Sequence, residues 1–538
     1  MRYSAARPSL AASWPLFARF RWKLAPALLI VGTGDWLFYQ RHLYGGYLGF
    51  FALAVLGALL AGRPVLRREG GALLAMAAAG LFAFALLYDA SLLAWTLFWA
   101  AAGVAALIPA TARFDDGWRW FQRLIWFGLR APFGPLIDLK RILKLRAAGR
   151  AGAWSLHAAL GTLALPVIGS AVILLLFSAA NPLFEQFFSS LLLPDLSPEL
   201  IVRLAFWGVL FAMAWALLRP RLPRRLLPAF DGWNDRRLPG VSVASVTLSL
   251  VVFNLIFALQ NLMDVAWLWG WAPMPAGMTM AGYAHRGAYP LVATALLAAL
   301  FVLVTLRPGS ETAQNRVVRS LVMFWIGQNV FLVASSMLRT ADYIEAYSLT
   351  RLRIAALVWM ALVAFGLAAI CWRLLRARSA AWLINVNLAA AGLVLGVICF
   401  VDLGAVAAQW NVRHARDVGG QGVALDLCYL RQLGDSALLP LLSLEQRTDL
   451  RPDFRERVRT VRMDLHARLA RELGQRWSLL GQRRLEMART MTAAIGSVAV
   501  DAGARDCSGA LIPPAAAAAP NGNVGPQTDR ALTAETGR

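Results

Sequence analysis

The chain alternates long apolar runs with short polar connections as far as about residue 403. A helix needs about 20 mostly apolar residues to cross the ~30 Å hydrocarbon core of a bilayer, and most of these runs are about that long. We therefore expect an all-α polytopic helical membrane protein with about eleven transmembrane helices. The expected spans are 24–39, 47–62, 72–88, 91–110, 155–178, 200–218, 242–262, 289–306, 317–337, 354–372 and 382–403.

The composition excludes a water-soluble globule. Of the 538 residues, 59% are apolar and only 15% are charged, which leaves too little polar surface to cover a soluble fold. In a soluble protein, the formal net charge of +23 would indicate binding to nucleic acid. The arginines instead cluster on alternate connections between apolar runs. We therefore expect the lipid bilayer, and no nucleic acid, as a partner.

The charges of the connections predict an orientation, because cytoplasmic loops hold an excess of Lys and Arg. The basic stretches are 1–23, 63–68, 111–154, 219–238, 307–316 and 373–378. Between them, the 179–199 connection has acidic residues and no basic one. The first run resembles a secretory signal, but Asp35 interrupts it and no small-residue cleavage site follows, which favours an uncleaved span. We expect an inner (plasma) membrane protein with a cytoplasmic N-terminus and, after an odd number of spans, an extracytoplasmic C-terminus.

The basic 111–154 connection contains a segment too short and too charged to span the bilayer. Near residues 118–130, Arg119, Gln122, Arg123 and Arg130 fall on one helical face, with bulky apolar residues on the rest. This pattern predicts an interfacial helix on the inner leaflet. A calmodulin-like or nucleic-acid-binding patch is the alternative interpretation.

Beyond residue 403 both signs of charge mix and the helical periodicity becomes that of a soluble protein. Residues 404–507 therefore predict a small extracytoplasmic helical domain, with its longer helices at 455–473 and 476–491. Residues 508–538 are of low complexity, and we expect them to be disordered. Cys428 and Cys507 both fall in the expected outer domain, where a disulfide would persist, and the sequence leaves their pairing open.

Three polar residues of the 242–262 span and its outer end lie on one helical face. Asn254, Asn261 and Asp264 are spaced at i, i+7 and i+10. Polar side chains at membrane depth are costly, so they usually face protein or water. They indicate either a cavity or relay that opens outward, or hydrogen bonds that fix the packing of helices.

More polar residues gather on the expected outer side. Tyr283, His285 and Arg286 follow a proline-containing turn, and a histidine beside an acid can shuttle protons, although loop histidines often only bond locally. A second cluster ends the 317–337 span, and we expect its arginines to pair with Asp342, Glu345 or Asp264. The members of this cluster are Arg339, Asp342, Tyr343, Glu345, Tyr347, Thr350, Arg351 and Arg353.

Several kinds of chemistry have no motif in this chain. The sequence has no Gly-x-x-x-x-Gly-Lys phosphate loop, no His-Glu-x-x-His and no Cys-x-x-Cys. Its five histidines are too scattered to indicate a metal site from their spacing. We therefore expect no metal or cofactor and identify no catalytic nucleophile.

At these same stretches the sequence resembles a bacterial family of polytopic membrane proteins known only as domain of unknown function 4173, and its relative 4153. The matching segments are 181–184, 260–264, 277–279, 283–287, Arg339 with Tyr343, 347–353, Asn411 with Val412, and 425–430. Ser348 stands where the family pattern has glycine, and Cys428 is not part of that pattern. The resemblance covers nearly all of the chain after residue 150, and it implies an inner-membrane protein with no assigned activity.

Two functional hypotheses follow. In the first, the outward polar cluster lines a cavity that binds a ligand or moves a solute or proton. In the second, the polar residues hold helices together in a structural or signalling scaffold, whose C-terminal domain recruits an envelope protein. A membrane enzyme acting on a lipid-linked substrate ranks third.

Overall fold

The computed structural model describes residues 10–111, 116–149, 198–223, 226–227, 242–268, 311–376, 378–495 and 503–512, with single positions near residues 170 and 300. The described residues form an all-helical fold. Seven of the described helices are long and apolar enough to cross a membrane, and α2 (Tyr47–Gly62) is apolar but shorter. The expected count of eleven is therefore not reached within the described residues. Most of the expected spans 155–178 and 289–306 lies outside them.

The first helical bundle contains α1 (Leu10–Gly34), α2, α3 (Gly70–Tyr88), α4 (Leu92–Leu107) and α9 (Pro198–Leu218). α1 continues directly into a π-helical turn, η1 (Asp35–Gln40). The core joins large side chains such as Phe51, Phe98 and Trp215 to many fully buried alanines. Small residues let the helices approach closely, and a Cβ added at Gly49 of α2 would lie 2.7 Å from the Ala83 carbonyl oxygen of α3.

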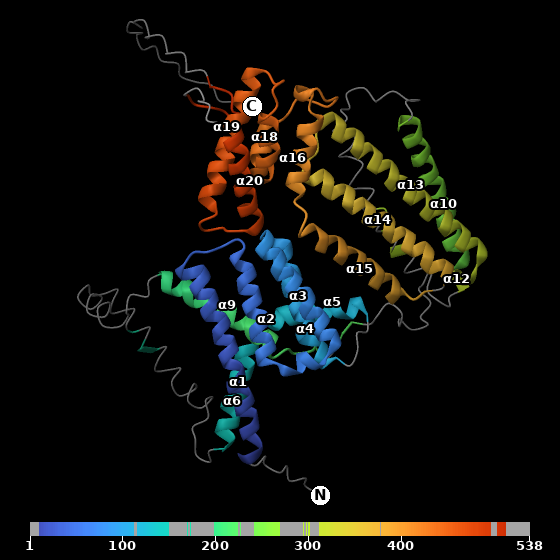
Figure 1. The fold of residues 1–538 in the computed structure, drawn as a ribbon. Coiled ribbons are helices and arrows are strands. Elements are labelled where there is room, and N and C mark those ends of the chain that lie inside the picture. Colours follow the sequence, from blue (N-terminus) through green and yellow to red (C-terminus); the bar gives the residue numbers. More distant parts are fainter. Residues whose placement is uncertain are drawn as a thin grey trace, which may run out of the picture.

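The second group of helices contains α10 (Val243–Leu268), α12 (Glu311–Gln314), α13 (Arg316–Tyr347), α14 (Arg351–Arg376) and α15 (Ala380–Ile398). α10 and α13 pack along each other, α14 follows α13, and α15 lies nearest the first bundle (Figure 1). The Asn385 side-chain oxygen on α15 accepts a hydrogen bond from the Gly117 backbone N–H at 2.7 Å. This bond joins α15 to the first residue of α5 (Gly117–Arg130).

α5 (Gly117–Arg130) is the amphipathic helix expected near residues 118–130, and α6 (Gly134–Gly149) follows it. Its apolar residues Phe121, Ile125 and Leu129 are exposed, whereas Gln122 is buried and bonds to the backbone of Leu227. An apolar face turned outward is costly in water and favourable in a lipid interface. On α6, the buried Asp138 accepts a hydrogen bond from Trp215 at 2.9 Å and pairs with Arg221 at 2.7 Å.

The C-terminal domain is a compact helical unit. It contains α16 (Leu403–His414), α17 (Leu427–Leu433), α18 (Leu438–Glu445), α19 (Pro452–Glu472) and α20 (Leu479–Ile495), with the short 3-10 turns η5 (Arg416–Val418) and η6 (Gly434–Ala437). Leucines dominate its core. A disulfide joins Cys428 to Cys507, and the described chain continues to Ile512. Arg457 bonds to the Ser508 carbonyl at 3.3 Å and helps to hold that segment against α19.

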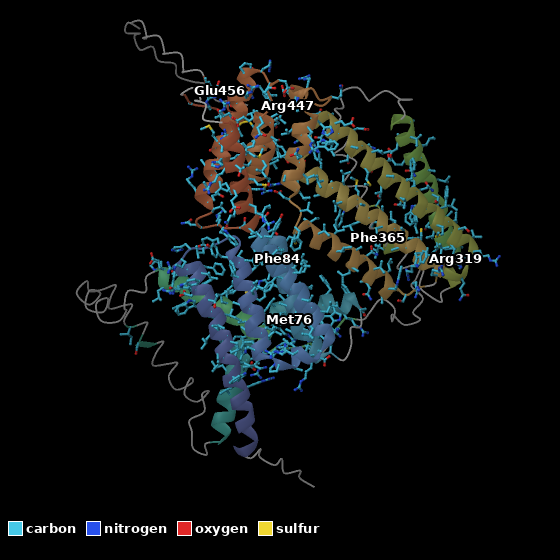
Figure 2. All side chains as sticks on the ribbon, viewed as in Figure 1. Met76, Phe84, Arg319, Phe365, Arg447 and Glu456 are labelled. Carbon is cyan, nitrogen blue, oxygen red and sulfur yellow. A yellow bond between two sulfur atoms is a disulfide. The ribbon has the colours of Figure 1, made fainter. Side chains whose placement is uncertain are left out.

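The C-terminal domain docks on one end of the membrane helices (Figure 1). In the α1–α2 connection, the backbone N–H of Tyr44 donates to the Gln475 carbonyl at 2.7 Å, and that of Gly46 donates to the Trp477 carbonyl at 2.5 Å. The arginine-bearing turn η2 (Pro64–Arg68) and the start of α13 are at the other ends of these helices. Figure 2 shows Arg319, on the first turn of α13, at the right-hand end of that helix, away from Arg447 and Glu456 of the docked domain.

Candidate functional site

A ladder of polar side chains connects α10 to α13. The Asn254 side-chain N–H₂ donates to the Leu321 carbonyl at 3.1 Å, and its oxygen accepts from the Gln328 amide at 2.7 Å. About two turns further along α10, the Asn261 side-chain N–H₂ donates to the Gln328 carbonyl at 3.2 Å. Both asparagines thus bond to the facing helix, as their spacing on one face of α10 predicts.

Asp264 ends this ladder with an ion pair to Arg339. The carboxylate is 0% exposed, accepts a hydrogen bond from Gln260 at 2.9 Å and one from Ser335 at 3.2 Å, and contacts the Arg339 guanidinium directly. Of the three acids we considered as partners for the arginines of this cluster, Asp264 is the one that pairs with Arg339. The pair places two opposite charges together in a buried site, where an unpaired charge would be strongly disfavoured.

On α13, Arg339 was already among the candidate residues, but Gln328 and Ser335, which complete this half of the ladder, were not. Gln328, Ser335 and Arg339 recur at i, i+7 and i+11, which places them on one helical face inside an otherwise apolar helix. That periodicity is visible in the sequence and would have identified them as partners of the α10 face.

At its C-terminal end, α13 carries an aromatic and cationic stack. The rings of Tyr343 and Tyr347 lie 4.8 Å apart, and the Arg353 guanidinium lies 4.1 Å from the Tyr343 ring centre. Arg353 also donates to the Tyr347 carbonyl at 2.7 Å. The turn between the helices contains Ser348 at φ +68°, a region of backbone conformation that favours glycine.

Two residues next to this turn hold the C-terminal domain. Arg351 donates to the Ser436 hydroxyl at 2.9 Å and to the Leu433 carbonyl at 3.1 Å. Asn411 of α16 bonds both backbone groups of Leu349, accepting from its N–H at 2.7 Å and donating to its carbonyl at 2.9 Å. Arg351 therefore belongs to the domain contact and not to the Asp264 group, whereas Thr350 accepts from the Arg353 N–H at 3.3 Å.

A cavity of about 240 Å³ lies between the C-terminal end of α13 and the C-terminal domain. Glu345 lines it from α13, and Trp410, His414 and Gln421 line it from α16 and the following loop. The His414 ring stacks on Trp410 with 3.8 Å between centres, and its Nδ1 lies 2.9 Å from the Trp410 carbonyl oxygen. These contacts fix an aromatic wall beside a carboxylate.

The candidate residues thus separate into groups. Asn254, Asn261, Asp264 and Arg339 form the buried ladder, Glu345 lines the 240 Å³ cavity, and Tyr343, Tyr347, Thr350 and Arg351 surround the α13–α14 turn. Tyr283, His285 and Arg286 lie outside the described residues. Nothing in the sequence pattern singled out Trp410, His414 and Gln421, because they meet Glu345 only through the docking of the C-terminal domain. Among the described residues, no group of His, Cys, Asp or Glu could hold a metal ion.

Apolar helices with outward apolar side chains and a polar domain docked at one end define an integral membrane protein with several spans. The chain belongs to the family described as Domain of unknown function (DUF4153), which matches residues 75–444. This match confirms the resemblance to family 4153 that the sequence motifs indicated. No curated protein and no solved structure matches the chain.

Proposed function

We propose that this protein lies in the inner membrane with its N-terminus in the cytoplasm and its C-terminal domain outside. The basic turn η2 and the basic start of α13 lie at the ends of the helices away from the docked domain, and cytoplasmic loops hold the excess of arginine. The many arginines of the docked domain do not oppose this orientation, because folded domains are translocated largely regardless of charge.

Within this orientation, the protein binds a small polar ligand in the outward cavity of Glu345, Trp410 and His414. The observation that carries this proposal is that α13 and the C-terminal domain each supply part of the lining. A ligand that contacts both parts stabilises the docked arrangement by its differential affinity for it. Arg339 lies six residues deeper on α13, about 9 Å along the helix at 1.5 Å per residue, so the ladder is placed to respond to binding or to relay a proton.

Orientation and exposure are tested together with single cysteines. The background carries Cys371→Ala and Cys399→Ala and keeps the Cys428–Cys507 disulfide. In intact cells, a membrane-impermeant maleimide labels Gln421→Cys, and it labels Arg67→Cys only after permeabilisation. Labelling in the reverse pattern overturns the orientation.

Binding is tested with Glu345→Gln, matched to Asp342→Asn on the same helix, since Asp342 is exposed and outside the cavity lining. In a strain that lacks the native gene, Glu345→Gln fails to restore the deletion phenotype at normal abundance, while Asp342→Asn restores it. If both variants restore it equally, the cavity has no part in the function.

The second candidate is the scaffold, and the sealed Asp264–Arg339 pair favours it. Side chains that are fully buried and paired contribute to packing and need no ligand. In this function the C-terminal domain recruits an envelope protein. Asp264→Asn then lowers the abundance of the protein, and the variant that remains in the membrane keeps its activity per molecule.

A further inference from the structure

A second and larger cavity, of about 390 Å³, lies where the C-terminal domain covers the α3–α4 connection. Its volume falls in the range of small-ligand sites. Asp89 lines it from the membrane helices, and the other charged residues come from the C-terminal domain. These are Arg431, Asp435, Arg468, Glu472 and Arg476.

One part of this lining suits an anion. Arg431 and Arg468 both pair with the same carboxylate, Asp464, at 2.8 and 2.7 Å, so two guanidinium groups share one negative charge. Arg476 is exposed and lines the same cavity. The planar guanidinium group of arginine matches the geometry of a phosphate and forms strong charge-assisted hydrogen bonds with its oxygens.

The other part suits a cation. Desolvation by the surrounding protein raises the pKa of Asp89, and the carboxylates of Asp435 and Asp402 raise it further, against the opposing effect of Arg484 and Arg351. Asp435 is held by Arg484 at 2.8 Å, and Glu472 adds another carboxylate to the lining. Negative groups crowded around Asp89 favour a positive charge placed beside it.

The position of the cavity adds a third constraint on the kind of ligand that it binds. Asp89 and Ala90 connect the ends of α3 and α4, and Leu92, at the start of α4, is 79% exposed. Trp477, next to the lining residue Arg476, stacks against Phe50 of α2 with 6.0 Å between ring centres. The charged cavity therefore lies next to the apolar belt of the helices, at the level where lipid headgroups lie.

We propose that this cavity binds a phosphate ester that carries a primary ammonium group. The phosphate lies against Arg431, Arg468 and Arg476, and the ammonium lies against Asp89 and Glu472. Phosphatidylethanolamine of the adjacent leaflet and its water-soluble glycerol phosphoester share this chemistry. This proposal concerns a cavity separate from that of Glu345 and does not depend on the function proposed there.

The test uses the full chain, purified in detergent and exposed to equal amounts of phosphatidylethanolamine, phosphatidylglycerol and phosphatidylcholine, with bound lipids counted by native mass spectrometry. The wild type retains phosphatidylethanolamine in preference to the other two, because phosphatidylglycerol has no ammonium and the quaternary ammonium of phosphatidylcholine donates no hydrogen bond. Arg476→Gln weakens retention by about tenfold, as expected from the loss of one charge-assisted hydrogen bond. The matched control is Arg471→Gln, an exposed arginine on α19 outside the lining, and it retains the lipid as the wild type does.

A second variant separates the two parts of the site. Asp89→Asn keeps phosphate binding and lowers the preference for phosphatidylethanolamine over phosphatidylglycerol by about tenfold. Titration calorimetry with soluble glycerophosphoethanolamine then identifies the source: direct binding indicates the free phosphoester, and retention of the lipid alone indicates the membrane. Equal retention by Arg476→Gln and Arg471→Gln, or an unchanged lipid preference in Asp89→Asn, overturns the proposal.

Discussion

Removing one partner of the Asp264–Arg339 pair is the most direct test of the ladder between α10 and α13. Asp264 is 0% exposed and Arg339 is also buried, so Asp264→Leu leaves a guanidinium in a site from which water is excluded. Breaking a buried pair in this way costs about 3–5 kcal/mol. Arg339→Leu leaves an unpaired carboxylate and costs a similar amount.

The double variant Asp264→Leu with Arg339→Leu distinguishes the loss of the ion pair from the effect of changing the size of the two side chains. Neither charge is left alone in it, and replacing a buried pair by apolar residues is often close to neutral. The free energy of unfolding, measured by reversible denaturation in mixed micelles, then shows a coupling of about 3 kcal/mol or more between the two positions. Asp342→Asn, an exposed acid on the same helix, changes stability by less than about 0.5 kcal/mol. If the double variant loses the sum of the two single losses, the two side chains do not interact and the reasoning is wrong.

Three further predictions concern the connections on the docked side of the helices. Ser348→Gly raises the free energy of unfolding by about 1 kcal/mol, because it relieves a backbone at φ +68°, and Ser348→Ala gives no such gain in the same denaturation assay. Gly45→Ala lowers the midpoint of thermal unfolding and raises the rate at which limited proteolysis cleaves the docked domain. The residue has φ +65° and an added Cβ would lie 2.8 Å from the Trp477 carbonyl oxygen, whereas Gly57→Ala, with open space around it, gives no loss. Asp89→Asn stabilises the ligand-free protein near pH 7. The folded-state pKa of Asp89 lies above its ordinary value of 3.8, so ionisation disfavours the folded state as pH rises, and the advantage of the variant fades towards about pH 4. A pH-independent difference between Asp89→Asn and the wild type contradicts this explanation.

Part of the candidate site could be predicted from local spacing. The positions of Asn254, Asn261 and Asp264 on one face of α10 follow from 3.6 residues per turn, and all three meet α13. Only the structure identifies Asp264 as the partner of Arg339, because the charge pattern of the sequence left three acids as possible partners for the arginines of this cluster. The two cavities at the docked domain could not be predicted, since their residues come together over long sequence separations.

The sequence alone determines that this chain is a helical membrane protein with an amphipathic helix in its 111–154 connection and a separate C-terminal helical domain. Apolar runs, charge alternation and helical periodicity are local properties, and the cost of placing polar groups in lipid makes them decisive. Only the tertiary structure decides that Arg351 and Asn411 fasten the C-terminal domain to the α13–α14 turn, and that Asp89 faces arginines more than 340 residues away. These pairings depend on which surfaces meet when the domain docks, and no local pattern carries that information.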